Sequence, residues 1–365
     1  ERIQKTLDSF GVESHLEEFS FDTFQIKKAK LKVTEPYTKE YTVTGYGRCG
    51  NTAEDGLEAS FAYAENGDDI SLAHVSGKIV MVNDPVRKDM YRKLVKAGAV
   101  GFISIAGSPL DEGVDLVPCA YALPKNLPGE EKKAAGKEAQ NYDNRIPGVS
   151  IHYKDAIELV TKGASQVCLS VEQETVTRTS RNVVARIDGT DKTEEILTLT
   201  AHYDSVPEGP GAYDNMSGAA IIMELCRYFH AHRPRRTMEF IWFGAEEKGL
   251  LGSQNYIKIH ENELSAHRFN MNVDLAGQLV GGTVAGVTGD ASVCSMITYM
   301  AHEIGIGMST KNQIWGSDSN TFAWKGIPAM TLNRDGFGMH TRHDTIALLS
   351  DWSLERSAVL LGYIA

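Results

Sequence analysis

The sequence is short of several features that mark common classes of protein. Among its 365 residues, no apolar run approaches the ~18 residues that a membrane-spanning helix needs. Basic residues are fewer than acidic ones, 37 against 48, so the net charge is −11 with histidine neutral. Since binding to nucleic acid depends on a basic face, this deficit argues against a nucleic-acid partner. We expect neither a membrane protein nor a nucleic-acid binder.

Cysteine is also scarce, and the cysteines that occur are widely scattered. The five cysteines include no CxxC pair, so a thiolate zinc cluster has no support. An odd number leaves at least one thiol outside any disulfide scheme, which weakly favours a cytoplasmic over a secreted protein. No charged-then-apolar leader is visible after Glu1, but a processed chain would look the same, so the compartment stays open.

The composition that remains is that of a globular protein large enough to bury a core. Hydrophobic residues make up 42% and charged residues 23%, and the length predicts about two domains. Residues 34–170 are rich in glycine and turn residues, whereas from residue 171 onward strands alternate with helices. This rhythm predicts an α/β fold, a mixed and mostly parallel sheet with helices on both faces.

The expected elements follow from the spacing of apolar residues. In the second segment we expect strands at 182–187, 196–201, 238–243, 270–273 and 327–332, and helices at 216–229, 250–260, 294–304 and from 354. The start of the chain predicts a helix at 3–10 and two extended runs, 14–21 and 25–33. The glycine-rich segment predicts strands at 78–82, 102–105 and 146–151, with helices at 90–96 and 154–162.

Side chains of metal-binding type follow several of these predicted strands. Each has a simpler interpretation alone: Asp214 before a helix suits an N-cap, and Glu246 and Glu247 suit the positive end of a helix dipole. Together they are more specific, because carboxyl ends of parallel strands meet at one edge of a sheet. The residues concerned are His202, Asp204, Asp214, Glu246, Glu247, Asp274 and His340.

Two histidines and three carboxylates form a ligand set that zinc accepts. Five ligands are too many for one tetrahedral zinc that keeps an open position, but they suit two metals if one carboxylate bridges them. Two metals about 3.5–4 Å apart can hold a shared water and bring its pKa close to neutrality. In the adjacent pair Glu246 and Glu247, one carboxylate can bind metal while the other acts on the water as a general base.

The order of five motifs resembles the co-catalytic two-zinc aminopeptidases, a family typified by small bacterial leucyl aminopeptidases. The motifs are AHYDS (201–205), AYDNMSGAA (212–220), GAEEKGLLGS (244–253), NVDLAG (272–277) and HTRHDT (340–345). Glutamate carboxypeptidase, the transferrin receptor and glutaminyl cyclase are more distant relatives of this family.

The resemblance implies a role for each strand-end residue. His202 and Asp274 bind the first zinc, Glu247 and His340 bind the second, and Asp214 bridges both. Glu246 is the base that shuttles the proton of the water, and Asp204 hydrogen-bonds the other ring nitrogen of His202. The Asp214–Asn215 peptide is expected to be cis, and His343 is the rival of His340 as ligand.

The chain departs from the family in a later loop, where relatives often carry Ser-Asp-His. Here Gly316 is followed by Ser317, Asp318, Ser319 and Asn320, without the histidine. This difference leaves the substrate preference open. We expect Asp318 to be structural, with contact to substrate as the alternative, and candidate pocket residues are Asn333, Arg334 and Phe337.

The glycine-rich segment resembles a protease-associated domain in GKIVMV (77–82), KAGAVGFI (96–103) and IPGVSI (146–151). Relatives carry this module as an insertion, which implies a discontinuous peptidase domain, 1–33 and 171–365, around an inserted domain, 34–170. The insertion roofs the cleft, supports a homodimer or is ornamental, and the sequence leaves these alternatives open.

The resemblance implies a zinc exopeptidase with two Zn²⁺ ions per chain that removes the N-terminal residue from peptides with a free N-terminus. A carboxypeptidase or dipeptidase with the same metals is the alternative, and it needs a cationic pocket for which Arg334 is the candidate. A glutaminyl cyclase fits the complete ligand set and the insertion less well. A catalytically dead binding protein, like the transferrin receptor, is disfavoured because all five ligands and Glu246 are present.

Overall fold

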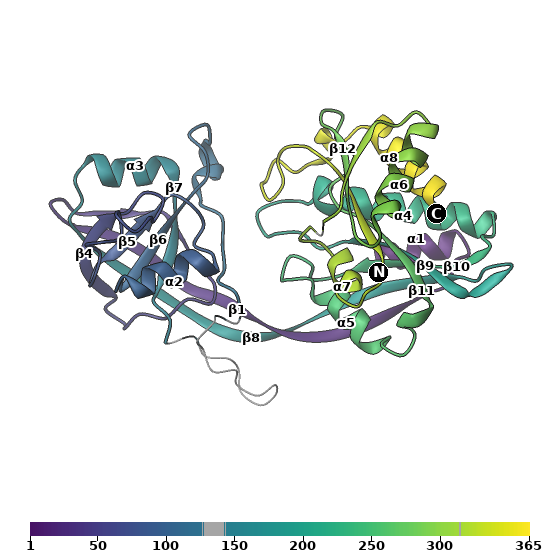
Figure 1. The fold of residues 1–365 in the computed structure, drawn as a ribbon. Helices are drawn as coiled ribbons and strands as arrows, with labels where there is room; N and C mark the ends of the chain where they lie inside the picture. The colour runs from purple at the N-terminus through teal and green to yellow at the C-terminus, as the bar shows by residue number, and fades with distance from the viewer. Residues whose placement is uncertain (126, 128–141, 143, 314) are drawn as a thin grey trace. The chain divides into compact units, whose positions relative to one another are not determined.

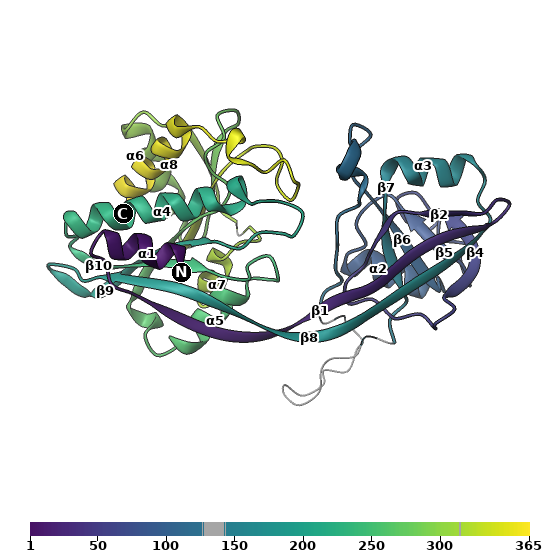
Figure 2. The same cartoon turned by 180° about the vertical axis from the view of Figure 1, so that it is seen from behind.

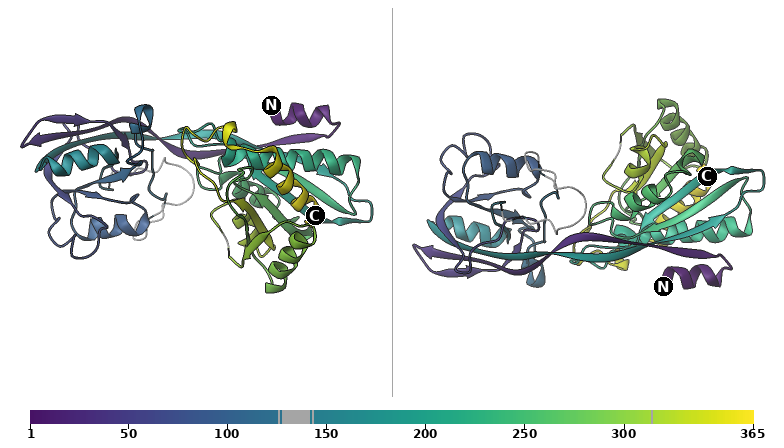
Figure 3. Two further views of the ribbon diagram at one scale, coloured as in Figure 1. Left: turned by 90° about the horizontal axis from the view of Figure 1, so that it is seen from above. Right: turned by 90° about the horizontal axis from the view of Figure 1, so that it is seen from below.

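The computed structural model describes residues 1–125, 127, 142, 144–313 and 315–365. The chain divides into two compact units, the first formed by Glu1–Phe21 with Thr179–Ala365 and the second by Asp22–Arg178. Both termini belong to the first unit, as Figure 3 marks. The boundaries expected from composition, 33/34 and 170/171, differ from this division because two 22-residue strands continue through the change in composition. These strands are β1 (Ser14–Glu35) and β8 (Gln166–Ile187).

The first unit is built on a mixed, mostly parallel sheet, which confirms the predicted fold class. Besides β8, its strands are β9 (Lys192–His202), β10 (Arg236–Phe243), β11 (His267–Val273), β12 (Thr283–Val287), β13 (Met308–Lys311) and β14 (Ala329–Arg334). Their order is β13-β12-β14-β11-β9-β10-β8. The pairs β10–β9, β9–β11, β11–β14 and β12–β13 are parallel, whereas β8–β10 and β12–β14 are antiparallel.

Helices cover both faces of this sheet, as Figures 1 and 2 show from opposite sides. One face carries α1 (Arg2–Ser9), α4 (Ser217–Ala231), α6 (Ala291–Glu303) and α8 (Asp351–Ile364), and the other carries α5 (Leu251–Ile259) and α7 (Ser319–Ala323). The alternation of β10 follows these layers. Met238, Phe240 and Trp242 join one core, whereas Ile241 and Phe243 join the other. A strand buried on both faces is therefore largely apolar, with Glu239 as the exception in the run 238–243.

The second unit has its own sheet, in the order β8-β4-β5-β6-β7-β3, with β1 paired to β8 and β2. Its further elements are β2 (Lys39–Tyr41), β3 (Val43–Gly45), β4 (Leu57–Tyr63), β5 (Ile79–Val82), α2 (Lys88–Lys96), β6 (Gly101–Ala106), β7 (Gly148–His152) and α3 (Tyr153–Thr161). Figure 3 shows α2 and α3 on opposite faces of this sheet. Tyr91 of α2 accordingly packs edge-on against Phe102 of β6.

Some elements differ from those expected. The two extended runs near the start form the single strand β1, because nothing at residues 22–24 interrupts the backbone pairing. β12, β13 and α7 were not expected, since each is only four or five residues long and carries little periodicity. Among the described residues, no helix combines the length and the apolar character that crossing a bilayer requires.

Candidate metal centre

The candidate site lies where three neighbouring parallel strands end. β9 ends at His202, β10 is followed by Glu246 and Glu247, and β11 is followed by Asp274. The register places Phe243 beside His202, so the residues that follow β9 and β10 emerge at the same edge. This is the edge where ligands bind in open α/β sheets.

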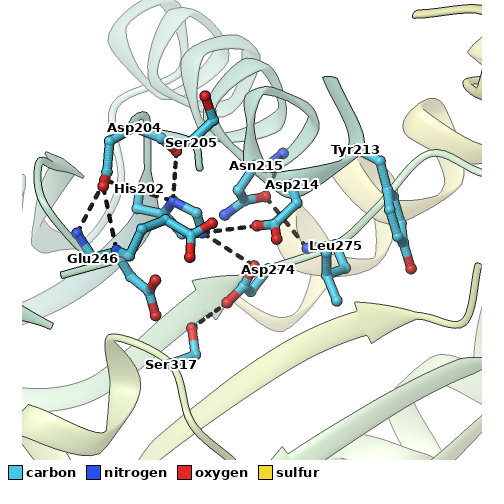
Figure 4. Close-up of polar contacts among 12 residues, drawn as sticks. His202, Asp204, Ser205, Tyr213, Asp214, Asn215, Glu246, Asp274, Leu275 and Ser317 are labelled. Atoms are coloured by element: carbon cyan, nitrogen blue, oxygen red, sulfur yellow. Dashed lines mark hydrogen bonds and ion pairs between the residues drawn. The ribbon is translucent and has the colours of Figure 1, made fainter. Parts of the chain in front are cut away.

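The first group of potential metal ligands contains His202, Asp214 and Asp274. Nε2 of His202 lies 3.2 Å from Oδ1 of Asp214 and 3.3 Å from Oδ1 of Asp274. Figure 4 shows these three side chains converging from three different segments of the chain. One atom from each residue lies within 4.8 Å of the others, close enough for one ion to bind all three.

The second group contains Asp214 again, with Glu247 and His340. Oδ2 of Asp214 lies 3.0 Å from Nε2 of His340, and Oε1 of Glu247 lies 3.2 Å from the same nitrogen. Asp214 thus offers one carboxylate oxygen to each group. Neither group includes His343, which is exposed.

The side chains present fit metal ions. Oε1 of Glu247 is buried and accepts no hydrogen bond from the described part of the chain, and Nε2 of His340 lies 3.2 Å away. A buried carboxylate oxygen without a hydrogen bond is costly unless another partner, such as a cation, satisfies it. Two imidazoles and three carboxylates are also donors that zinc prefers.

The negative charge of the centre shifts the pKa values of its side chains. Burial alone would raise the pKa of Asp214, but hydrogen bonds from His202 and His340 lower it to about 2. The hydrogen bond with Asp214, together with the nearby carboxylate of Glu247, raises the pKa of His340 to about 10. The pKa of His202 is raised as well, since the nearby Asp274 and Asp214 outweigh the effect of burial. Both rings are therefore held where positive charge is favoured.

Glu246 lies beside the two groups in a more extreme environment. Burial, together with the nearby carboxylates of Asp318 and Asp274, raises the pKa of its carboxyl group to about 10. A glutamate whose neutral form is favoured in this way holds a proton readily. Its place next to Glu247 and its affinity for a proton suit the role of a base that accepts and returns one.

The structure corrects the expected contact of Asp204. Its carboxylate lies 3.7 Å from Nδ1 of His202, beyond hydrogen-bonding distance, and Nδ1 instead contacts the backbone carbonyl of Asp204 at 3.1 Å. The carboxylate accepts the backbone N–H groups of Glu246 at 3.0 Å and Glu247 at 3.3 Å. The chain turns directly after β9, which brings the carbonyl under the ring and the side chain toward the neighbouring loop.

Two residues that the sequence analysis did not assign hold the ligands of the first group. Ser317 donates a hydrogen bond of 2.6 Å to Oδ2 of Asp274. Asn215 donates a hydrogen bond to the carbonyl of Val273 at 2.8 Å and accepts one from the N–H of Leu275 at 3.3 Å. It therefore binds the backbone on both sides of Asp274. In the sequence, Asn215 directly follows the predicted ligand Asp214, whereas Ser317 lies beside no predicted ligand and had no such signal. The Asp214–Asn215 peptide is cis, as expected.

Three residues at the site adopt left-handed backbone conformations without being glycine. They are Ala245 with φ 59°, Leu275 with φ 67° and His340 with φ 60°. Each lies in a different loop, and each is a ligand or lies next to a ligand or to Glu246. Such conformations are uncommon outside glycine and persist where the surrounding structure enforces them, most often at functional sites.

The candidate pocket residues have different surroundings. Arg334 donates to the carbonyls of Gln278 and Leu279 at 2.5 and 2.8 Å and to Oγ1 of Thr283 at 3.0 Å, which commits its guanidinium to the chain itself. Phe337 is exposed.

Asn333 pairs with Val284 within the sheet. Asp318 is fully buried, and burial raises its pKa to about 7. The burial favours the structural interpretation of Asp318 over contact with substrate.

A mostly parallel sheet whose carboxyl edge gathers carboxylates and imidazoles into two groups fits a metal-dependent hydrolase. The family model described as "Peptidase family M28" matches residues 182–365, half of the chain. The chain belongs to peptidase family M28 and is a metallopeptidase. The resemblance seen in the five motifs is thereby confirmed.

Similar proteins include some named as aminopeptidases and some named as carboxypeptidases. The chain is 32% identical to Aminopeptidase YwaD of Bacillus subtilis (strain 168) over 231 residues, 62% of this chain and 46% of that protein. It is 23% identical to Carboxypeptidase Q of Mus musculus over 379 residues, 100% of this chain and 78% of that protein. The match to YwaD thus spans less than half of that relative.

A solved structure has the same fold. The structure of BSAP, a zinc aminopeptidase from Bacillus subtilis, superposes with a TM-score of 0.79 at 24% identity. The superposition covers 99% of this chain and 86% of that one. At this identity the likeness establishes the fold, which includes the mixed sheet described above.

Proposed function

We propose that this chain is a zinc-dependent aminopeptidase that hydrolyses the N-terminal peptide bond of peptides with a free N-terminus. The observation that carries the proposal is the sharing of Asp214 between two ligand groups, one oxygen to each, with Glu246 alongside. Membership of a peptidase family supports peptide substrates, and the names of YwaD and BSAP support attack at the N-terminus.

Each ligand group would hold one zinc ion. His202 and Asp274 would bind the first ion, Glu247 and His340 the second, and Asp214 both. Zinc ions bound there would polarise the carbonyl of the peptide and lower the pKa of the attacking water. This arrangement gives two ions per chain.

The residues of the chain perform the remaining steps. Glu246 accepts a proton from the attacking water at its carboxylate and returns it to the leaving amine, so that it ends the cycle as it began. Asp204 holds the backbone of Glu246 and Glu247 through the two N–H bonds, which orients the base relative to the adjacent ligand. Ser317 orients Asp274 in the same way.

The contacts of Arg334 favour an aminopeptidase over a carboxypeptidase. A carboxypeptidase needs a cation that pairs with the C-terminal carboxylate of its substrate, and Arg334 was the candidate. Its guanidinium instead binds two backbone carbonyls and a hydroxyl of the 278–283 segment. The acidic character of the centre suits the positively charged α-amine of an aminopeptidase substrate.

The test compares three kinds of substrate on the zinc-loaded protein. Aminoacyl chromogenic amides, the same compounds blocked at the amine, and peptides blocked at the amine but with a free C-terminal carboxylate are incubated with and without a chelator. We expect cleavage of every substrate with a free amine, none of the amine-blocked ones, and loss of activity with the chelator. Cleavage that requires a free C-terminal carboxylate would reject the aminopeptidase.

A carboxypeptidase is the second candidate, because the matches to Carboxypeptidase Q extend over the whole chain. The same panel of substrates distinguishes it.

We also propose that the second unit is an inserted protease-associated-like domain. The support for this proposal is the position of the unit between two segments of the first unit.

A further inference from the structure

Asp344 is a buried carboxylate on the loop that carries His340. Its Oδ1 accepts the backbone N–H of Tyr213 at 2.5 Å, and its Oδ2 accepts the N–H of Asp214 at 3.0 Å. The N–H of Ala212 donates to the backbone carbonyl of Asp344 at 3.2 Å. Three successive N–H groups, including that of the shared ligand, are thus bound to one residue of another loop, 130 positions away from Asp214 in the chain.

Hydrogen bonds within the loop connect Asp344 to the turn that contains His340, so the contacts of Asp344 also help to place His340. The N–H of Asp344 donates to the carbonyl of Thr341 at 3.1 Å, and Oγ1 of Thr341 donates to the carbonyl of Gly338 at 2.7 Å. His340 lies within the turn that the bond between Thr341 and Gly338 closes. Its side chain is 47% exposed, so packing against the core does little to hold it.

The chemistry of Asp344 is specific to a carboxylate. Two N–H donors that approach from neighbouring residues need two acceptor oxygens, and a buried acceptor or donor without a partner is costly. An asparagine offers one acceptor oxygen and turns an N–H donor toward the other N–H group. The change from Asp to Asn therefore removes one of the two bonds while it preserves the size of the side chain.

We infer that Asp344 is a positioning residue for the metal centre. It holds Asp214 and His340 at the separation that the second ion requires. Asp344 touches neither ion nor substrate and acts through the backbone of residues 212–214. This inference rests on the proposed function in one respect, since it takes Asp214, Glu247 and His340 to form a zinc group.

The test is a cobalt(II) titration of the metal-free Asp344→Asn protein, followed by its absorption bands and checked by metal analysis with zinc. The unchanged chain is expected to bind two ions. We expect the variant to bind one ion with nearly unchanged affinity and the other about 10–100-fold more weakly, the range typical for residues that orient ligands. Asp290→Asn is the matched control, because Asp290 also accepts a backbone N–H, from Ser292 at 3.1 Å, but caps α6 instead.

Two further variants separate positioning from a general loss of structure. Asp344→Glu keeps both oxygens but moves them by one methylene, and we expect it to weaken the second ion as well. In a His340→Ala background the second group is already lost, so adding Asp344→Asn should leave the affinity of the remaining ion nearly unchanged. An equal loss of affinity in that background would overturn the inference.

The outcome also distinguishes this inference from the function on which it rests. If the unchanged chain binds a single ion, the two-ion arrangement fails first. If the unchanged chain binds two ions, and a folded Asp344→Asn or Asp344→Glu protein binds both with unchanged affinity, the positioning role of Asp344 alone is wrong.

Discussion

The carboxylate of Asp204 accepts the backbone N–H of Glu246 at 3.0 Å and therefore joins the ends of two neighbouring strands. The other carboxylate oxygen accepts the N–H of Glu247 at 3.3 Å. Glu246 and Glu247 follow a residue with left-handed backbone, Ala245. The two bonds from Asp204 hold this turn in the orientation that sends one glutamate to the ligand group and leaves the other beside it.

We expect Asp204→Asn to lower kcat/KM for an aminoacyl chromogenic amide by about 10–100-fold, the range typical for residues that orient ligands. The cause is the replacement of one acceptor oxygen by a donor that faces a backbone N–H. Steady-state kinetics at matched zinc content measure the effect. Asp188→Asn, at an exposed position, is the control and should retain full activity. Unchanged kinetics for Asp204→Asn would remove this role.

Glu246→Ala should keep its zinc and lose turnover. Removal of a positioned general base typically lowers the rate by about 10²–10⁴-fold, whereas Glu246 is not among the residues of the two ligand groups. Zinc content by metal analysis and kcat for the same amide are both needed. A variant with full activity would show that another residue is the base, and one without zinc would show that Glu246 is a ligand.

His340→Ala is predicted to lower the zinc content, and His343→Ala to leave it unchanged. Nε2 of His340 approaches both Asp214 and Glu247, whereas His343 belongs to neither ligand group. Metal analysis after dialysis at a defined free zinc concentration compares the two variants directly. The reverse result would move the ligand by three positions along the loop.

The active protein should contain close to two zinc ions per chain, because Asp214 offers an oxygen to each of two groups. Stepwise addition of zinc to the metal-free protein, with activity and bound metal measured on the same samples, checks this number. Full activity with one firmly bound ion would contradict the shared carboxylate. A surface site would add metal without changing activity.

A pH-dependent stability difference is expected at His260, which belongs to neither ligand group. Nε2 of His260 lies 2.6 Å from Oε1 of Glu17, and this hydrogen bond raises the pKa of His260 in the folded protein although burial opposes it. The protonated ring therefore favours the folded state. Its contribution is complete below the unfolded pKa of about 6.5 and is lost as the pH rises through the folded pKa.

His260→Gln should lower the free energy of unfolding by about 1 kcal/mol at pH 6 and by less at pH 9. Urea unfolding of the variant and the unchanged chain at both pH values gives this difference. His302→Gln, a change at an exposed histidine near the end of α6, serves as the control. A greater loss at pH 9 than at pH 6 would reverse the sign and contradict the assignment.

Much of the fold and of the site followed from local sequence patterns. The run 238–243, apolar except for Glu239, marked a strand buried on both faces, and β10 occupies that position. His202 and Asp274 were placed at strand ends by counting, and parallel pairing brings those ends to one edge. These predictions succeeded because strand periodicity and strand direction are properties of short segments.

The tertiary structure alone decided how the side chains engage one another. In the folded chain, the carboxylate of Asp204 binds the backbone N–H of Glu246 and not the ring of His202. The guanidinium of Arg334 donates to backbone carbonyls of the same chain. The tertiary structure also brought Asp344 to the backbone of Asp214, 130 positions away. Contacts of this kind depend on the conformations of loops that close over long stretches of chain, and no local period in the sequence encodes them.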